Sequence, residues 1–226
     1  MLEKNWNDHV AHAEEIARSL GFRDVRDRII ELAQPRPEDV VDDVGAGTGL
    51  LSLALAPKVS RVWAIDIAAG MTEYLTAKVA SAGLDNIETV TASAVSLPLV
   101  DASADLAVSN YCFHHLPDDG KERALAEIRR VLRPGGRLVF GDVMFRVSLR
   151  EARDRDVVRN KMRAMLRRGI PGIIRLAKNG VRFAGRRWEQ PVRATWWHEA
   201  LVRAGFVEVQ VEELAHEGGV ASARRP

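Results

Sequence analysis

The chain has 226 residues, of which 46% are hydrophobic and 28% charged, and its formal net charge is +2. This composition is typical of a globular protein with a sizeable core, and so small a net charge argues against a field that draws nucleic acid to the whole protein. A single cysteine, Cys112, excludes an intramolecular disulfide and a cysteine-based metal site. The sequence shows neither a membrane span of about 20 apolar residues nor a signal peptide, so we expect a cytoplasmic protein.

The start of the chain predicts two helices that cap the rest of the domain. Residues 4–20 have the apolar spacing of an amphipathic helix, and Gly21 is placed to end it. A second helix is predicted over 23–33, because prolines follow directly. We therefore expect an N-terminal helical cap over residues 1–37.

A glycine-rich turn follows this cap. Residues 40–44 predict a buried parallel strand, and residues 50–56 predict a helix that starts directly after the glycines. Such a turn lets the backbone approach a ligand in front of a helix N-terminus. The ligand is not predicted to be a dinucleotide, because Leu50 occupies the place of the third glycine in the dinucleotide fingerprint.

Asp66 follows the glycine turn at a spacing in the sequence that suggests a role in ligand binding. Residues 61–66 predict a second strand that ends at Asp66, which lies 21 positions after Gly45. At this distance a carboxylate can accept hydrogen bonds from ribose hydroxyls. Asp66 could instead only cap the next helix, but the glycine turn before it favours the ribose interpretation.

Several motifs in this order carry a family resemblance. Asp43 followed by three alternating glycines resembles motif I of the class I S-adenosylmethionine-dependent methyltransferases. Residues 91–99 resemble a later stretch of that family, with Ser93 where the family usually has Asp. Residues 105–117 resemble its D-x-V-x-S-x-x-x-x-H-H-L signature, found in ubiquinone/menaquinone-type and many small-molecule enzymes, and residues 132–136 resemble the motif at the next junction.

The resemblance implies a fold, a cofactor and its binding residues. The implied fold is α/β and Rossmann-like: a seven-stranded, mostly parallel, doubly wound sheet with helices on both faces and an antiparallel last strand. The implied cofactor is S-adenosylmethionine, with S-adenosylhomocysteine as the product. The implied cofactor-binding residues are Asp43, Gly45, Ala46, Gly47, Thr48, Gly49, Asp66, Ile67, Met71, Ser93, Ala94 and Asn110.

The remaining elements fit a single domain over residues 1–226. Within it we expect a cofactor-binding core over 38–147 and a C-terminal helix and strand pair over 191–226. The predicted elements after the second strand are a helix up to residue 82, strands at 86–91 and 105–109, a helix at 118–132, a strand at 137–145, a helix at 196–204, and strands at 205–211 and 219–224.

A basic insert separates these two parts, over residues 148–190. Between Arg146 and Arg187 there are fourteen arginines and lysines but only three acids. Apolar residues recur at helical spacing, and residues 169–172 break the segment into two helices. A lid over the acceptor, a homodimer contact, a basic surface for a membrane or RNA, and ordinary solvated helices all remain open. RNA is disfavoured, because the sequence lacks interleaved aromatics and an RNA-binding module.

The chemistry follows from the activated methyl group of the cofactor. The protein has to align an acceptor with it, and needs a general base only for a protonated acceptor. His115 is the first candidate base and His114 the second, because imidazole titrates near neutrality and the pair follows a central strand. Tyr111 and Asp142 follow the fourth and fifth strands and are candidates for touching the acceptor. No metal is expected.

We therefore expect methyl transfer from S-adenosylmethionine to an O, N or C nucleophile of a small molecule. One alternative is a quinone, lipid or RNA acceptor that is engaged through the basic insert. The other is a regulatory protein that binds the cofactor but has lost catalysis, since Ser93 carries no charge to hold adenine.

Overall fold

The structure of the chain is a computed structural model that describes residues 9–145, 152–166 and 190–226. Its strands are β1 (Val40–Val44), β2 (Arg61–Asp66), β3 (Ile87–Thr91), β4 (Ala104–Asn110), β5 (Leu132–Val143), β6 (Val207–Glu213) and β7 (Gly218–Arg224). Its helices are α1 (Val10–Ala17), α2 (Leu20–Ala33), α3 (Ser52–Leu55), α4 (Ala69–Ser81), α5 (Asp118–Val131), α6 (Ala152–Leu166) and α8 (Ala194–Arg203). Short 3-10 turns, η2 (Ala56–Lys58) and η3 (Phe113–His115), follow α3 and β4.

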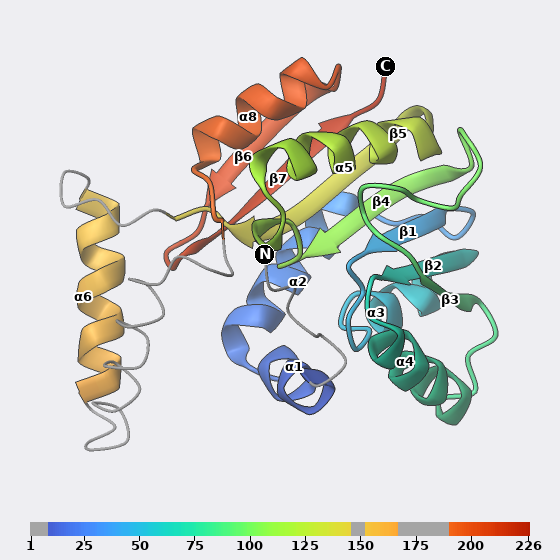
Figure 1. Cartoon of the computed structure of the whole chain (residues 1–226), viewed down its shortest axis with the longest axis horizontal. Helices are drawn as coiled ribbons and strands as arrows, with labels where there is room; N and C mark the ends of the chain where they lie inside the picture. The colour runs from blue at the N-terminus through green and yellow to red at the C-terminus, as the bar shows by residue number, and fades with distance from the viewer. Residues whose placement is uncertain (1–8, 146–151, 167–189) are drawn as a thin grey trace.

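The described strands form one seven-stranded sheet in the order β3-β2-β1-β4-β5-β7-β6. β1 to β5 pair in parallel, and β7 lies antiparallel between β5 and β6 (Figure 1). The order reverses between β1 and β4, and this is the point at which open parallel sheets bind ligands beyond their carboxyl ends. The predicted fold class is confirmed.

Helices cover both faces of the sheet. Buried side chains of α2, α3 and α4 pack on one face, and those of α5 and α8 pack on the other (Figure 1). Successive strand residues point to opposite faces, so β1 contributes Val41 to the first layer and Val44 to the second. Each layer excludes water from one side of the strands that carry the site.

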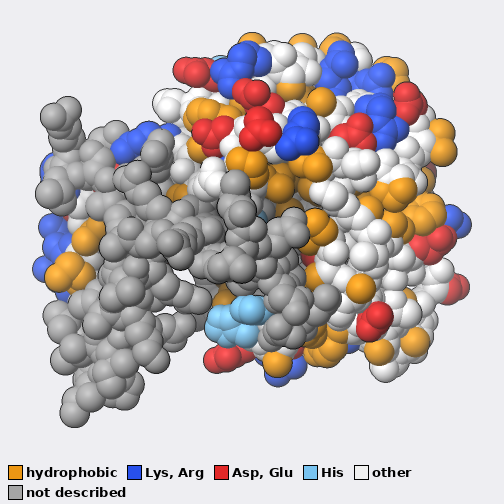
Figure 2. Space-filling view, viewed as in Figure 1, with side chains coloured by type: hydrophobic (Ala, Val, Ile, Leu, Met, Phe, Trp, Pro, Cys, Tyr) orange, Lys and Arg blue, Asp and Glu red, His pale blue; other side chains and the backbone are white. Residues whose placement is uncertain are grey.

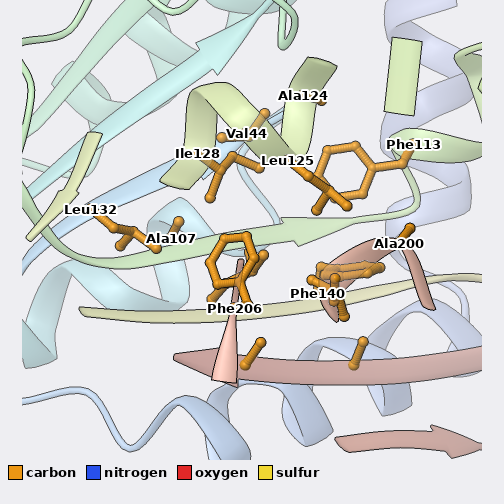
Figure 3. Packing of buried hydrophobic residues seen from close by; sticks show 14 of the residues in the cluster. Val44, Ala107, Phe113, Ala124, Leu125, Ile128, Leu132, Phe140, Ala200 and Phe206 are labelled. Carbon is orange, nitrogen blue, oxygen red and sulfur yellow. The ribbon is translucent and has the colours of Figure 1, made fainter. Parts of the chain in front are cut away.

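Aromatic side chains form the centre of the layer under α5 and α8 (Figure 3). The rings of Phe113 and Phe140 meet edge to face with centroids 5.1 Å apart, and Phe140 meets Trp197 at 4.7 Å. Such pairs add to the free energy gained by burying the rings. Because Phe113 opens η3, this packing fixes the segment that carries the two predicted catalytic histidines.

The outer faces of α5 and α8 carry charges of both signs (Figure 2). Arg203 of α8 and Glu122 of α5 form an exposed ion pair at 3.0 Å that joins the two helices. Exposed pairs of this kind contribute little to stability. These faces are therefore ordinary solvated surface.

The first helix boundary differs from the prediction. Gly21 was expected to end the first helix, but it lies within the first turn of α2, and α1 ends at Ala17. The break falls at Ser19, whose extended backbone (φ −69°, ψ 149°) precedes α2. The side chain of Ser19 makes no capping hydrogen bond, so the boundary follows this extended backbone and neither the glycine nor a serine cap.

Only part of the basic insert lies within the described residues. Its first predicted helix is α6, and the buried carboxylate of Asp154 pairs with Arg193 at 3.1 Å, which ties α6 to the start of α8. The predicted break at 169–172 and the second helix lie outside the described residues, as do residues 1–8. No described helix is long and apolar enough to span a bilayer.

Candidate active site

The glycine turn after β1 is held against the end of β2 by backbone hydrogen bonds. The amide of Gly45 donates to the carbonyl of Ile65 at 2.8 Å, and the amide of Gly47 donates to the carboxylate of Asp66 at 2.9 Å. The φ angles of Gly45, Gly47 and Gly49 are 77°, 52° and 88°, a region that residues with a Cβ rarely adopt. The turn and the acid that the sequence paired with it are therefore in direct contact.

The three glycines differ in their surroundings. A Cβ on Gly45 would lie 2.3 Å from Sγ of Cys112, and one on Gly49 would lie 2.3 Å from Cδ1 of Leu75. A Cβ on Gly47 would meet nothing within 4 Å. Gly45 and Gly49 thus allow close packing, whereas Gly47 faces open space in which a ligand can approach the backbone.

Asp66 presents a carboxylate at the end of β2. Its second oxygen accepts from the amide of Ala68 at 2.9 Å. Burial raises the pKa of Asp66, and the backbone amides that it accepts from oppose this rise. Ile67 follows directly and is 60% exposed, which is unusual for an apolar side chain at a strand end. An acid that can accept from ribose and an exposed apolar surface therefore lie side by side.

Asp43 is turned inward. Its carboxylate is 1% exposed and accepts from the hydroxyl of Ser52 at 2.5 Å, and burial raises its pKa to about 7. It anchors the start of α3 to β1. Ala46 and Thr48 are also buried, and the carbonyl of Thr48 accepts from Nζ of Lys78 at 2.9 Å. Direct contact of these side chains with the cofactor stays a prediction.

Asn110 ends β4 with a buried acceptor that has no partner. Its Nδ2 donates to the carbonyl of Phe22 in α2 at 3.5 Å, whereas its Oδ1 is buried and has no hydrogen-bond partner among the described residues. A buried acceptor left in this state costs free energy. A donor on a ligand, such as an ammonium group, would satisfy it.

Three further predicted cofactor residues lie in the segments that follow β2 and β3. Met71 is 3% exposed in α4. Ser93 follows β3 and its hydroxyl accepts from the amide of Val95 at 3.4 Å, while Ala94 packs half-buried against the core. The local contact of Ser93 differs from the adenine contact that the resemblance implies, and that contact remains a prediction.

His114 and Asp142 form a buried pair beyond the ends of β4 and β5. The fully buried carboxylate of Asp142 accepts from the amide of His114 at 2.8 Å and lies 2.5 Å from its Nδ1. An ionised carboxylate only accepts, so Nδ1 is the donor in this pair, and a neutral ring held in this way would have its lone pair on Nε2. The amide of Val143 also donates to this carboxylate at 2.7 Å. The pair therefore holds His114 in the tautomer of a base.

The other predicted catalytic residues lie beside this pair. The ring of His115 is 3.8 Å from that of His114, and the ring of Tyr111 is 6.3 Å away, edge on. Tyr111 stacks on Phe22 with centroids 4.2 Å apart. Burial raises the pKa of Tyr111 further above its ordinary value, so the phenol stays protonated at neutral pH and is not a base.

The structure joins the two predicted halves of the site through a residue that the sequence did not single out. Cys112 packs on Gly45 and immediately precedes η3, so the glycine turn and the histidine segment are in contact. The sequence also missed Phe22, whose contacts with Tyr111 and Asn110 join α2 to the end of β4 and leave no local pattern. Among the described residues, no group of three or more His, Cys, Asp or Glu is placed to hold a metal ion.

Comparisons with known proteins agree with this geometry. Residues 41–136 match a family model described as a methyltransferase domain. Over this range the chain is similar to methyltransferase domains, and its strand order is that of the class I methyltransferase fold. The matched range contains the glycine turn, Asp66 and the His114–His115 segment of this methyltransferase domain.

The relatives share the domain but not the whole length. An uncharacterized methyltransferase of Oceanobacillus iheyensis is 31% identical over 135 residues, which is 60% of this chain and 61% of that protein. The malonyl-[acyl-carrier protein] O-methyltransferase of Methylococcus capsulatus is 43% identical over 43% of this chain and 35% of its own length. The chain thus matches less than two thirds of either relative.

A solved structure extends the likeness in fold. The chain is similar to an S-adenosylmethionine-dependent methyltransferase from Aquifex aeolicus with a TM-score of 0.68 and 18% identity, covering 96% of this chain and 98% of that one. At this identity the likeness shows the class I fold and no acceptor.

Proposed function

We propose that this protein transfers a methyl group from S-adenosylmethionine to an O, N or C nucleophile of a small molecule. The observation that carries the proposal is the contact between Gly47 and Asp66 beneath open space, at the point where the strand order reverses. The matched methyltransferase domain covers the same residues.

The described residues fit this cofactor. Gly47 leaves room at the backbone, Asp66 can accept from ribose hydroxyls, and the exposed side chain of Ile67 can lie against adenine. The unpartnered Oδ1 of Asn110 can accept from the ammonium of the amino-acid end. When bound, the cofactor supplies a methyl group already activated by the sulfonium charge.

The chain itself supplies alignment and a base. We assign the base to His114 ahead of His115, because Asp142 fixes its tautomer and leaves Nε2 able to take a proton. Tyr111 stays neutral, so its hydroxyl can position an acceptor by hydrogen bonding.

The described site favours a small-molecule acceptor. One relative is named for an acyl-carrier-protein acceptor, and the alternatives of a quinone, lipid or RNA acceptor depend on an insert that the structure describes only through α6. We propose a small molecule as the acceptor, because it needs no binding surface beyond the described site. Turnover with a panel of acceptors separates all of these from a catalytically inactive binding protein.

Ligand-dependent thermal unfolding tests the cofactor. S-adenosylhomocysteine at about 100 times its dissociation constant should add about 2.7 kcal/mol and raise the midpoint by several degrees, whereas NADH should not. Asp66→Ala should abolish the shift, and Asp85→Ala, which removes an exposed acid from a loop, should keep it. A shift with NADH alone would overturn the proposal.

Turnover tests the base once the panel has provided a hydroxyl acceptor. His114→Ala and Asp142→Asn should lower the rate by about 10²–10⁴-fold while S-adenosylhomocysteine still binds. His115→Ala should cost much less. If His115→Ala is the more damaging change, the base belongs to His115.

A further inference from the structure

A shallow groove lies beside the glycine turn, between α1, α2, α3 and α4. It has a volume of about 320 Å³, and α1 packs against both α2 and α4. Its lining contains four cationic side chains and a single acid, together with part of the turn; the lining residues are Glu14, Ala17, Arg18, Arg23, Arg26, Thr48, Gly49, Leu50, Leu53, Ala54 and Lys78.

The cations of this groove are only partly neutralised. Glu14 is shared between Lys78 at 3.0 Å and Arg18 at 3.2 Å. Arg26 pairs with Asp27, which is not part of the lining. Arg23 is exposed and makes no ion pair within the described part of the chain. The groove therefore carries an excess of positive charge that favours an anion.

A shallow, widely open apolar groove of about 400 Å³ adjoins the cationic one and shares Leu53 and Lys78 with it. Its other lining residues are Tyr74, Ala77, Ser81 and Ala82. The Nζ of Lys78 lies 5.5 Å from the centroid of the Tyr74 ring, at the boundary between the two grooves. An apolar trough that leads to a cluster of cations matches an alkyl chain with an anionic head.

We propose that these adjoining grooves form a second binding site, for a single-chain amphipathic anion such as a fatty acid or an alkyl phosphate. The chain lies along Leu53, Tyr74 and Ala77, and the head group meets Arg23, Arg26 and Lys78. Its lining includes Thr48 and Gly49 of the glycine turn but neither Asp66 nor the His114–Asp142 pair, so it adjoins the proposed cofactor site and is not the site of methyl transfer. It does not depend on the proposed function.

Calorimetric titration of the full chain with octyl phosphate, below its micelle concentration, tests the site. We expect saturable binding, with octanol and inorganic phosphate each at least about tenfold weaker. Arg23→Glu should weaken octyl phosphate about tenfold, and Ala77→Glu, which places a like charge in the apolar trough, should do the same. Arg36→Glu is the matched control, since Arg36 is exposed before β1 at the opposite end of the strands.

The outcomes separate the site from other sources of binding. Equal affinity for octanol, or unchanged affinity in Arg23→Glu, would overturn the proposal. So would binding to vesicles of anionic phospholipid without binding to monomeric octyl phosphate, because that result means a membrane surface. Unchanged S-adenosylhomocysteine binding in Arg23→Glu would show that the variant is folded and that the two sites are separate.

Discussion

At the scale of single residues, Asp42 is an acidic side chain in the core, where a strand normally carries an apolar one. It is fully buried, it lies between Trp63 and Ala107 in the sheet register, and neither carboxylate oxygen has a partner among the described residues. Burial raises its pKa to about 7. A buried carboxyl without a hydrogen bond costs about 1–3 kcal/mol, so the fold tolerates a destabilising side chain beside its site.

Asp42 and Asp43 should make stability depend on pH in an unusual direction. Both pKa values rise to about 7 in the folded state, so the native state holds more protons than the unfolded state between about pH 4 and 7. The free energy of unfolding should therefore fall as pH rises through this range. Asp42→Asn should reduce the difference in the free energy of unfolding between pH 4.5 and pH 7.5, as measured by denaturant titration. Asp42→Val should reduce it as well, and should also raise the free energy of unfolding by about 1–3 kcal/mol at pH 7.5. If the free energy of unfolding of Asp42→Asn changed with pH as much as that of the unsubstituted protein, this account would be contradicted.

Gly45 should not tolerate even a methyl group. Gly45→Ala places a Cβ 2.3 Å from Sγ of Cys112 at a φ of 77°, so it should destabilise the fold by about 1–3 kcal/mol and weaken S-adenosylhomocysteine binding. Gly83→Ala is the control, because it shares a positive φ of 65° but meets nothing within 4 Å. Thermal unfolding and calorimetry measure the difference, and equal effects of the two changes would contradict a packing role for Gly45.

Site residues could be placed from the sequence where they belong to one local motif. The alternating glycines and Asp66 were placed correctly relative to each other, because a strand, a turn and a strand fix their geometry. The hydrogen bond of Asp142 to His114 was not predictable, because it joins two strand ends and no spacing in the sequence encodes the pairing. The sequence ranked His115 ahead of His114 without knowledge of this contact, and the choice between them stays a prediction.

At the scale of elements, α5 holds the histidine segment in place through a buried lysine. Lys121 is fully buried, and its Nζ donates to the carbonyl of Leu116 at 2.8 Å and to Asp118 at 2.9 Å. It also lies 5.7 Å from the ring of Trp196 in α8. One ammonium thus joins η3, α5 and α8.

Removal of that ammonium should loosen the segment. Lys121→Met keeps the length and the apolar stem but leaves the carbonyl of Leu116 without its donor, so the free energy of unfolding should fall by about 1–3 kcal/mol. Amide exchange should rise at residues 113–116, while S-adenosylhomocysteine binding is retained. Lys58→Met, at an exposed position, should change neither quantity. Unchanged exchange in Lys121→Met would show that the aromatic packing alone holds η3.

Elements were predictable in type but less so at their ends. The strand 61–66 was predicted with its observed bounds, since apolar residues end at an acid. The helix predicted over 50–56 is reduced to Ser52–Leu55, because the glycine turn runs on to Leu51 and Pro57 brings a 3-10 turn. β5 begins at Leu132 and not at 137, since residue 132 already pairs with Ala104. Pairing partners far along the chain set these limits.

At the scale of the whole molecule, the sheet depends on a strand from the end of the chain. β7 pairs with β5 over Arg137–Val143 and with β6 on its other side. Ser222 stands in the middle, opposite Val139 and Gln210. The resemblance predicted this antiparallel strand, while the packing of α2 across β4, β5 and β7 had no sequence signal.

A proline substitution in β7 should strongly destabilise the fold. Ser222→Pro removes a backbone donor from a strand that is paired on both sides, so it should lower the free energy of unfolding by about 3 kcal/mol or more. Ser222→Thr, which suits a strand, should cost less than about 0.5 kcal/mol. Urea titrations followed by circular dichroism measure both, and a stable Ser222→Pro variant would mean that β5 does not need its neighbour.

The position of β7 also sets the order in which the protein can assemble during translation. β5 leaves the ribosome with one edge open, and the strand that covers this edge begins at Gly218. At about 5–20 residues per second, the edge waits for several seconds in a form that other chains could pair with. The stretch made in that interval contains the fourteen basic residues between 146 and 187. Because like charges repel neighbouring nascent chains, we expect this stretch to reduce aggregation of the unfinished sheet.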